Sequence, residues 1–496
     1  DLGVDFADLR AAARQPGVLG EDAEQLAVWD DHPVTSRRGL DRVVRRSQSR
    51  LLAFQHADGG WGWWKGGDSD TYMTAYVVAG LQVAADAGYA VDAGSLGRGY
   101  GHLKRRFYAE EGRGDPTWDH GRVYMAYVLG QRKLVGPADL DDLFAGRSEL
   151  SNYGKSLLAL TLHQLGDEER AQLVIDNLAE LARVDEASGS ASFDHDEGGS
   201  WWSWYNDRVE TNAWALRAFL AVDPDNPLCD GLMQWLVANR RGNRWQNTRD
   251  TAQVVQALAE YIRSRDELSP DFGLTVRVNG AEVHEARIDR KGLFRSRSQL
   301  VLTGDAIVDG VNTVEVETAG KGSLYVTAYL TYFTRERRIA ASGNRIQVTR
   351  EYVHLTPKRG QRSSARGEID VLEYDRKPLR DGASVGSGDR VEVRIVVESD
   401  NTYEYLVFED FKPAGFEAVE VKSGYMYDNG AWFNMELRDE RVAFFLDRLR
   451  QGRQVLNYQL RAETPGTFRA LPHAAHAMYA PRIRAISDSF LVNVTD

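Results

Sequence analysis

The acidic residues Asp139, Asp141 and Asp142 are a candidate for acid–base chemistry. An Asp-x-Asp-Asp group can donate a proton to an alkene when a dry pocket raises the pKa of one of its carboxyls. In this sequence the group follows Gly136 and Pro137 and precedes a predicted helix, where carboxylates commonly act as N-cap and first-turn residues. We therefore interpret the three aspartates as capping residues and keep the acid as an alternative.

The cysteine content of this chain gives little sign of a disulfide, a metal site or a catalytic nucleophile. Cys229 is the single cysteine, so no intrachain disulfide can form; this fits a reduced compartment and equally a periplasmic protein without bridges. Its context, Pro-Leu-Cys-Asp over 227–230, is typical of a small buried residue at the start of a helix. The sequence has no convincing set of zinc ligands, no Gly-rich phosphate loop and no nucleophile elbow. We expect neither a metal ion nor a cofactor.

Tryptophan is concentrated in the first half of the chain, in loops that also contain glycine. The loops are 59–64 (GGWGWW), 114–118, 198–204 (GGSWWSW) and 242–245. Six of the side chains could form a platform on which sugar rings stack: Trp61, Trp63, Trp64, Trp201, Trp202 and Trp204. We favour an interpretation in which they wedge between neighbouring helices, and keep a carbohydrate-binding protein as an alternative.

Helices are predicted between these loops, over 71–85, 123–132, 153–165, 210–219 and 250–263. In 153–165 the leucines recur at close to helical spacing and form a wide apolar face. Asp250 and Thr251 are expected to cap the last helix. Because the loop-and-helix unit recurs, the helices should pack on their neighbours as an open solenoid or a closed ring.

From about residue 272 the apolar period changes to two, which predicts strands. Strands over 272–278 and 281–288 are joined by Asn279-Gly280, a strong hairpin-turn signal. More strands are predicted over 311–318, 323–333, 346–355, 390–398, 403–408, 443–446 and 454–461, at a spacing typical of β-sandwiches. The basic, Ser-rich residues 359–368 are expected to form a flexible loop.

Charge and hydropathy exclude two classes of protein. The formal net charge is −12 and no dense Lys/Arg run is present, which argues against a nucleic-acid partner. The most basic stretch, 42–50 (RVVRRSQSR), is interpreted as the solvated face of a helix in preference to a phosphate-binding patch. No stretch approaches the ~18 apolar residues of a membrane span. The chain begins with Asp1 and shows no signal-like segment, so we expect a fragment or processed product.

Several motifs carry a resemblance to known families. Residues 55–64 (QHADGGWGWW) resemble loops found in terpene cyclases and in the thioester domains of the alpha-2-macroglobulin and complement superfamily. Residues 235–261 (WLVANRRGNRWQNTRDTAQVVQALAEY) resemble the last helical hairpin of thioester domains. Residues 405–417, 439–449 and 460–484 resemble the terminal macroglobulin-like domain of bacterial members. The chain thus resembles the C-terminal part of a bacterial alpha-2-macroglobulin.

This resemblance implies a multidomain fold, an all-α (α/α) toroid followed by all-β sandwich domains. The expected bounds are 1–268 for a toroid resembling the thioester domain, 269–335 for CUB-like strands, and 336–496 for a terminal macroglobulin-like, receptor-binding-domain-like sandwich. A class II terpene cyclase using Asp139, Asp141 and Asp142 is the enzyme alternative, but two trailing β domains do not belong to a cyclase.

The resemblance also implies a function. Family members trap proteases: cleavage of a bait region frees the toroid to move and restrain the attacker, so no residue is expected to catalyse turnover and the chain is not expected to be an enzyme. Bacterial relatives are periplasmic and often lipid-anchored, which implies an inner-membrane anchor in a missing N-terminal region. The implied partners are target proteases and a cell-wall synthesis protein.

Members with an active thioester carry a Cys-x-Glu-Gln motif, which this sequence lacks: Glu24-Gln25 follows Ala23, and Cys229 has no Glu-Gln partner. Two explanations stay open, a motif upstream of this chain or membership of a branch without thioesters. The resemblance makes His120 a candidate for steering acyl transfer. It also makes Met478 and Tyr479 candidates for shielding a thioester.

Overall fold

The computed structural model describes residues 36–496 with gaps. The residues left out are 110–115, 187, 195–206, 241–243, 294–298, 327, 329, 331–332, 334, 337, 365–366, 420–422, 429–430 and 479. The first of two compact units extends to residue 238 and resumes over 245–327, and the second holds 239–244 and 328–496. None of the helices in the described part is both long and apolar enough to cross a membrane.

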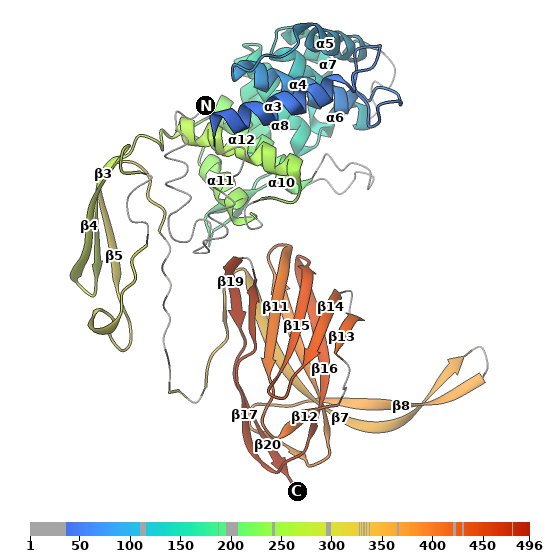
Figure 1. Cartoon of the computed structure of the whole chain (residues 1–496), viewed down its shortest axis with the longest axis vertical. Coiled ribbons are helices and arrows are strands. Elements are labelled where there is room, and N and C mark those ends of the chain that lie inside the picture. Colours follow the sequence, from blue (N-terminus) through green and yellow to red (C-terminus); the bar gives the residue numbers. More distant parts are fainter. Residues whose placement is uncertain are drawn as a thin grey trace. The chain divides into compact units, whose positions relative to one another are not determined.

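Helices, with one short sheet of β1 (Arg183–Asp185) and β2 (Ser190–Ser192), build the described part of the first unit as far as Ser264 (Figure 1). They are α3 (Arg37–Leu52), α4 (Thr71–Asp86), α5 (Ala93–Phe107), α6 (Pro116–Gly130), α7 (Asp141–Ala145), α8 (Asn152–Gln164), α9 (Glu168–Ala179), α10 (Arg208–Val222), α11 (Leu228–Ala238) and α12 (Thr248–Ser264). All the predicted helices are present, although α6 begins well before the predicted Val123.

In the helical part of the first unit, every second helix packs on the next one in a continuous series. Helix α4 contacts α6, α6 contacts α8, α8 contacts α10, and α10 contacts α12. The intervening helices α5 and α9 each contact the two members of this series on either side of them. Helix α8 lies inside the series, and its side chains Leu157, Leu158 and Leu162 are fully buried. A helix that is apolar on nearly every side has to be enclosed by others in this way.

The loop that holds Trp61 is fixed by hydrogen bonds to the helices on either side. The indole N–H donates to the carbonyl of Leu51 near the end of α3, at 2.7 Å. The backbone N–H donates to Oγ1 of Thr74, at 2.8 Å. Thr74 lies four residues after Asp70, the N-cap of α4, and its hydroxyl also donates to the Asp70 carbonyl. One tryptophan therefore joins the end of one helix to the first turn of the next.

Trp245 repeats this arrangement between α11 and α12. Its indole N–H donates to the carbonyl of Leu236 at 2.7 Å, and its backbone N–H donates to Oγ1 of Thr251 at 3.0 Å. Thr251 lies four residues after Asn247, whose extended backbone and side chain cap α12 by accepting from the Asp250 N–H. The predicted caps Asp250 and Thr251 were therefore wrong: the helix begins earlier, and both residues belong to its first turns.

The tryptophans divide into two groups by exposure. Trp61 and Trp245 are 1% and 5% exposed, which agrees with a role as wedges between helices. Trp64 is 78% exposed and Trp63 is 49% exposed, so these two do not fill the core. Trp201, Trp202 and Trp204 lie outside the described residues, as do parts of the loops 114–118 and 242–245.

A three-stranded sheet of order β4-β3-β5 ends the first unit. It comprises β3 (Asp271–Val278), β4 (Ala281–Asp289) and β5 (Val314–Lys321). Asn279 and Gly280 have φ of 52° and 80°, which confirms the predicted hairpin turn. The strand predicted over 323–333 is wrong, because its described residues have no strand partner and side chains such as Phe333 are fully exposed.

The second unit is built of strands (Figure 1). They are β6 (Ser342–Gly343), β7 (Ile346–Ser364), β8 (Gly367–Pro378), β9 (Ala383–Gly386), β10 (Arg390–Ser399), β11 (Tyr403–Phe411), β12 (Phe416–Ala418), β13 (Gly424–Asp428), β14 (Ala431–Leu437), β15 (Arg441–Leu449), β16 (Gly452–Ala462), β17 (Gly466–Ala470), β18 (Ala474–Ala477), β19 (Ala480–Ile486) and β20 (Phe490–Thr495). The strands predicted from residue 346 onward are all present.

These strands form sheets of order β12-β16-β10-β7-β8, β13-β14-β15-β11-β18-β19-β6 and β17-β20-β9. The first two share one apolar core, to which β10 contributes Val393 and Ile395 and the second sheet contributes Phe408 and Phe444. In β10 the alternate residues Val391, Val393, Ile395 and Val397 belong to this core, in agreement with the predicted period of two.

A charged pair lies inside that core and joins the two larger sheets. Arg350 on β7 and Asp410 on β11 are in contact at 2.5 Å, and their side chains are 1% and 0% exposed. The Tyr458 hydroxyl on β16 donates to the other oxygen of Asp410 at 2.6 Å. Burial raises the pKa of the Asp410 carboxyl, but Arg350, His473 and Tyr458 outweigh burial and hold that pKa below its usual value.

The flexible loop predicted for 359–368 is wrong. Strands β7 and β8 continue through this region as an antiparallel hairpin that projects from the sheets, with Arg359 opposite Leu372 and Ser364 opposite Gly367 (Figure 1). The prediction relied on the basic, Ser-rich composition of this stretch. Backbone hydrogen bonds can pair two strands without an apolar face, so residue types indicate such a hairpin only weakly.

The packing around Trp61 predicts opposite effects for two glycines of α5. A Cβ at Gly99 would lie 2.7 Å from Val78 and 2.9 Å from the Trp61 ring, whereas a Cβ at Gly97 meets nothing within 4 Å. Gly99→Ala should lower the free energy of unfolding by ~1–3 kcal/mol through overpacking. Gly97→Ala should raise it by up to ~1 kcal/mol because alanine favours the helix. Denaturant unfolding followed by helical circular dichroism measures both, and equal effects would contradict this account.

The buried pair in the sheets predicts a large loss from a single substitution. Arg350→Met leaves the Asp410 carboxylate without its cation in the core, and should lower the free energy of unfolding of this unit by ~3–5 kcal/mol. Arg345→Met is the matched control, because its pair with Asp400 is 43% exposed on both sides and should contribute less than ~1 kcal/mol. Hydrogen exchange of the strand amides, measured by mass spectrometry across a denaturant series, compares the two variants within this unit. Similar losses would show that burial does not set the strength of the pair.

Candidate functional site

Of the three candidate residues taken from the family resemblance, the structure describes the side chain of Met478 alone. His120 lies within α6, and its side chain is outside the described part. Met478 follows β18 in a turn, is 48% exposed, and donates its backbone N–H to the Tyr405 carbonyl at 2.8 Å. Tyr479 lies outside the described residues. The roles proposed for these three residues therefore stay predictions.

Asp139, Asp141 and Asp142 stabilise helix starts. The Asp139 carboxylate accepts the Gly136 N–H at 2.7 Å and closes the turn η2 (Pro137–Leu140). Asp141 pairs with Arg170 at 2.8 Å and remains 70% exposed. Asp142 pairs with Arg122, accepts the Leu143 N–H, and is 48% exposed. This geometry agrees with the capping interpretation, because none of these contacts lies in the dry pocket that an alkene-protonating acid would need.

Cys229 is the second residue of α11 and is fully buried. Burial raises the pKa of its thiol to about 11. A thiol that stays protonated is a poor nucleophile, so the side chain acts as a small apolar residue, as the sequence context predicted.

A group of buried charges that the sequence analysis did not identify lies where α10 and α12 begin. Arg249 of α12 and Glu210 of α10 form an ion pair of 2.8 Å between Nε and Oε2. Asp207, the N-cap of α10, lies 3.5 Å from the same guanidinium, and Asp250 lies 3.8 Å from it. Glu210 and Asp250 are 1% and 0% exposed. Three carboxyl groups thus share one cation: two are out of contact with water, and the Asp207 side chain is 19% exposed. We refer to Asp207, Glu210, Arg249 and Asp250 as the carboxylate cluster.

Tyrosines of three other helices surround this cluster. They are Tyr72 and Tyr76 of α4, Tyr124 of α6 and Tyr153 of α8. The rings of Tyr72 and Tyr124 lie 5.4 Å apart between centroids. Burial raises the pKa of each phenol, and the nearby Glu210 charge adds to that increase. The phenols therefore stay neutral at physiological pH.

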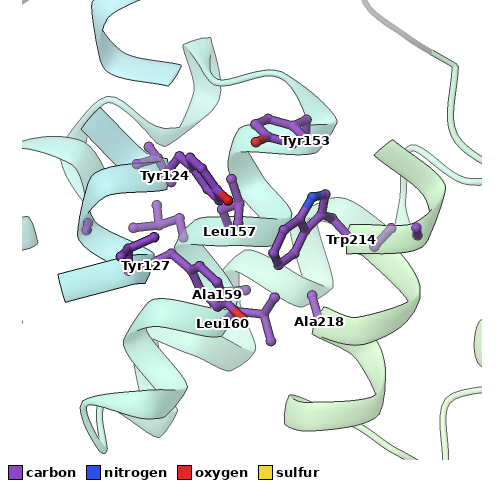
Figure 2. Packing of buried hydrophobic residues seen from close by; sticks show 14 of the residues in the cluster. Tyr124, Tyr127, Tyr153, Leu157, Ala159, Leu160, Trp214 and Ala218 are labelled. Atoms are coloured by element: carbon purple, nitrogen blue, oxygen red, sulfur yellow. The ribbon is translucent and has the colours of Figure 1, made fainter. Parts of the chain in front are cut away.

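Trp214 connects the carboxylate cluster to the aromatic core. Its indole N–H donates to Glu210 at 3.3 Å. Figure 2 shows Tyr124, Tyr127 and Tyr153 gathered around the indole, with ring centroids 6.2, 5.0 and 6.4 Å away and nearly perpendicular planes. Edge-to-face contacts of this kind are favourable because the positive edge of one ring meets the negative face of the other. Glu210 is thereby held by α10, α12 and the core together.

The electrostatics of the cluster favour bound protons. Burial raises the pKa of Glu210 to about 7, against the lowering effect of Arg249. Burial, with the Asp207 carboxyl beside it, raises the pKa of Asp250 to about 8. The cluster can therefore take up and release protons near neutral pH. The described groups offer no activated nucleophile, so the geometry supports a proton-linked structural role.

Part of this cluster has a signal in the sequence. Asp250, Val254, Ala257 and Tyr261 recur at spacings of four, three and four residues, and all are buried on one face of α12. A carboxylate in phase with an apolar stripe is a candidate for burial. The prediction that Asp250 caps the helix concealed this signal, because a capping residue is normally exposed to water.

The raised pKa values predict how stability depends on pH. The folded protein binds more protons than the unfolded chain between the unfolded pKa of about 4 and the folded values of about 7 and 8. The free energy of unfolding of the helices should therefore fall as pH rises through this range. Asp250→Asn should reduce that slope by about one proton, or ~1.4 kcal/mol per pH unit. Urea unfolding at a series of pH values, followed at the helical circular dichroism band, measures the slope.

Asp225→Asn provides the matched control, since Asp225 is exposed between α10 and α11. It removes a carboxyl of the same chemistry and should leave the slope unchanged. An unchanged slope in Asp250→Asn would mean that Asp250 is ionised in the folded protein, contrary to this account.

The amino-acid sequence is similar to one protein-family model and to several curated proteins. The family model of the bacterial Alpha-2-macroglobulin MG10 domain matches residues 346–482. The chain is 26% identical over 452 residues to the Alpha-2-macroglobulin homolog of Nostoc sp., covering 87% of this chain and 22% of that protein. It is 23% identical over 495 residues to the Alpha-2-macroglobulin of Escherichia coli K12, covering 93% of this chain and 26% of that protein.

Among solved structures, trypsin activated alpha-2-macroglobulin from Escherichia coli is similar at 19% identity and a TM-score of 0.47, over 100% of this chain and 31% of that chain. The chain spans about a quarter of the length of the curated relatives, 22% of one and 26% of the other. The MG10 match and the sequence similarity to these relatives together point to the bacterial alpha-2-macroglobulin family.

Proposed function

We propose that this chain is part of a broad-spectrum protease trap that acts by a change of conformation after bait cleavage. The observation that carries the proposal is the match of residues 346–482 to the bacterial MG10 domain. Two curated relatives named Alpha-2-macroglobulin or its homolog cover most of the remaining chain and support it. The whole protein would inhibit proteases by restraining them and would not act as an enzyme.

We assign the parts of the chain as follows. Residues 1–268 are the (α/α) toroid of thioester-domain type, 269–335 are CUB-like strands, and 336–496 are the terminal macroglobulin-like sandwich. The alternation of inner helices α4, α6, α8, α10 and α12 with outer helices α5 and α9 supports the toroid. The hairpin β3–β4 with β5 supports a separate strand region. The shared core of the two larger sheets supports the sandwich.

In this mechanism the toroid is the moving body and the terminal domain is its latch. Cleavage of a bait segment in another part of the protein would release the contact between them, and the displaced toroid would restrain the protease. Where a thioester is present, Met478 and Tyr479 would shield it and His120 would direct acyl transfer. We place the protein in the periplasm, held at the inner membrane by a region outside this chain. A cell-wall synthesis protein is a further proposed partner.

A titration of protease with the full-length protein tests the proposal. A trapped protease is restrained as a whole while its active site stays intact, so trypsin should keep its activity on a small peptide substrate and lose most of its activity on casein. The chain of residues 1–496 alone is the control. It should leave trypsin activity on both substrates unchanged, because the bait segment belongs to another part of the protein. Equal loss of both activities would indicate an active-site inhibitor, and no loss of either would contradict a trap.

The same full-length protein, treated with methylamine, distinguishes a covalent trap from a steric one. We expect a mass gain of one methylamine adduct together with one new titratable thiol, since the Cys-x-Glu-Gln motif would lie upstream of this chain. Absence of both would assign the protein to the branch without thioesters, and trapping would then be steric.

A further inference from the structure

Helix α3 carries an unusual concentration of positive charge. Its sequence, RRGLDRVVRRSQSRLL, contains six arginines and one aspartate, although the whole chain has a net charge of −12. At 100° per residue, five of the arginines fall on one side of the helix. They are Arg38, Arg42, Arg45, Arg46 and Arg50, and all are exposed.

The charge on this side of α3 is not neutralised by the described part of the protein. Arg37 pairs with Asp41 at 3.2 Å, and Asp41 is the one acidic residue of the helix. The other five arginines form no ion pair with any described residue. Arg38, Arg42, Arg46 and Arg50 follow one another at intervals of four residues, an arrangement in which like charges repel on a helix. The repulsion would be relieved by an anionic partner.

Apolar side chains accompany the arginines. Val43 and Leu51 of α3 are each 37% exposed, and Phe54, just beyond the end of the helix, is 39% exposed. Around the helix axis Val43 lies about 20° from Arg50 and so shares the arginine side, whereas Leu51 lies on the opposite side with Leu40 and Val44. An exposed apolar side chain beside basic residues can contact a membrane surface together with them. A soluble polyanion such as nucleic acid would bind the arginines, but contact with the apolar groups would add nothing to its binding.

We propose that α3 docks on the surface of a bilayer that contains anionic phospholipids. The arginines would bind lipid phosphates through their planar, forked N–H groups, and Val43, on the same side of the helix, would contact the acyl boundary. The helix lies parallel to the surface and does not cross it. This docking is independent of bait cleavage and of any anchor elsewhere in the protein.

Vesicle co-sedimentation of the chain of residues 1–496 tests the proposal. The chain should bind vesicles of phosphatidylglycerol and phosphatidylcholine, and should not bind phosphatidylcholine alone. Arg42→Gln with Arg46→Gln should weaken partitioning by about 30-fold, since each surface arginine contributes about a fivefold factor. Arg42→Lys with Arg46→Lys should retain binding, because it keeps the charge. Raised salt should reduce binding of the wild-type chain.

Arg132→Gln with Arg263→Gln is the control of equal charge, because both residues are exposed on other helices or turns of the first unit. It should leave binding within about twofold of wild type. Equal weakening by the two double variants would show that net charge alone is responsible, and would overturn the assignment to α3. Failure of the wild-type chain to bind anionic vesicles would overturn it as well.

A further measurement distinguishes binding to a membrane from binding to a soluble polyanion. Val43→Ser should weaken vesicle binding several-fold and leave the helical circular dichroism unchanged. If a duplex oligonucleotide competes fully with the vesicles and Val43→Ser has no effect, α3 is a general polyanion-binding helix and the proposal is wrong.

Discussion

The burial of the Glu210 and Asp250 carboxyl groups beside the Arg249 guanidinium constrains how the helices of this chain pack. Apolar packing tolerates small rotations of one helix against the next, whereas a buried ion pair is favourable only in a narrow geometry. Arg249 and Glu210 therefore fix the register of α12 against α10. Because Trp214 donates to Glu210 and is itself enclosed by tyrosines of α6 and α8, that register extends to the neighbouring helices.

The tryptophan loops place the helix starts where the cluster requires them. The last carbonyls of any helix lack intrahelical donors, and the first N–H groups lack acceptors. Trp245 donates its indole N–H to such a carbonyl of α11. Asn247, three residues before Asp250, accepts the backbone N–H of Asp250 in the first turn of α12. The loop thus satisfies both helix ends and sets the position of the buried charges. Trp61 performs the same function between α3 and α4.

Much of the fold could be predicted from the sequence, because the helices and most strands carry a clear apolar period. The errors share a physical cause: they fall where hydrogen bonds, and not apolar burial, determine the structure. The hairpin of β7 and β8 has no apolar alternation around Ser364. Residues 323–333 are rich in Tyr, Val and Thr, but the described ones among them have no partner strand. The cap of α12 was misplaced because Asn247, Asp250 and Thr251 can all cap a helix by residue type.

The candidate site was harder to predict than the fold. Residue types identified Asp139, Asp141 and Asp142, but the exposure of a carboxylate depends on tertiary neighbours that a motif does not contain. Asp250 carried a periodic signal within α12. Glu210 and Arg249 become partners only after α10 and α12 pack together, and no spacing along the chain specifies that contact.

The ratio of carboxyl groups to guanidinium groups determines the direction of the pKa shifts in the two buried clusters. In the sheets, one guanidinium faces one carboxylate, with His473 and a tyrosine donor beside it, and Asp410 keeps a lowered pKa despite its burial. In the helices, one guanidinium faces three carboxyls, and burial prevails over attraction for Glu210 and Asp250. Falling pH therefore removes stability from the sheets as Asp410 becomes protonated, while rising pH removes it from the helices. The same residue types thus give the two units of one chain opposite responses to pH.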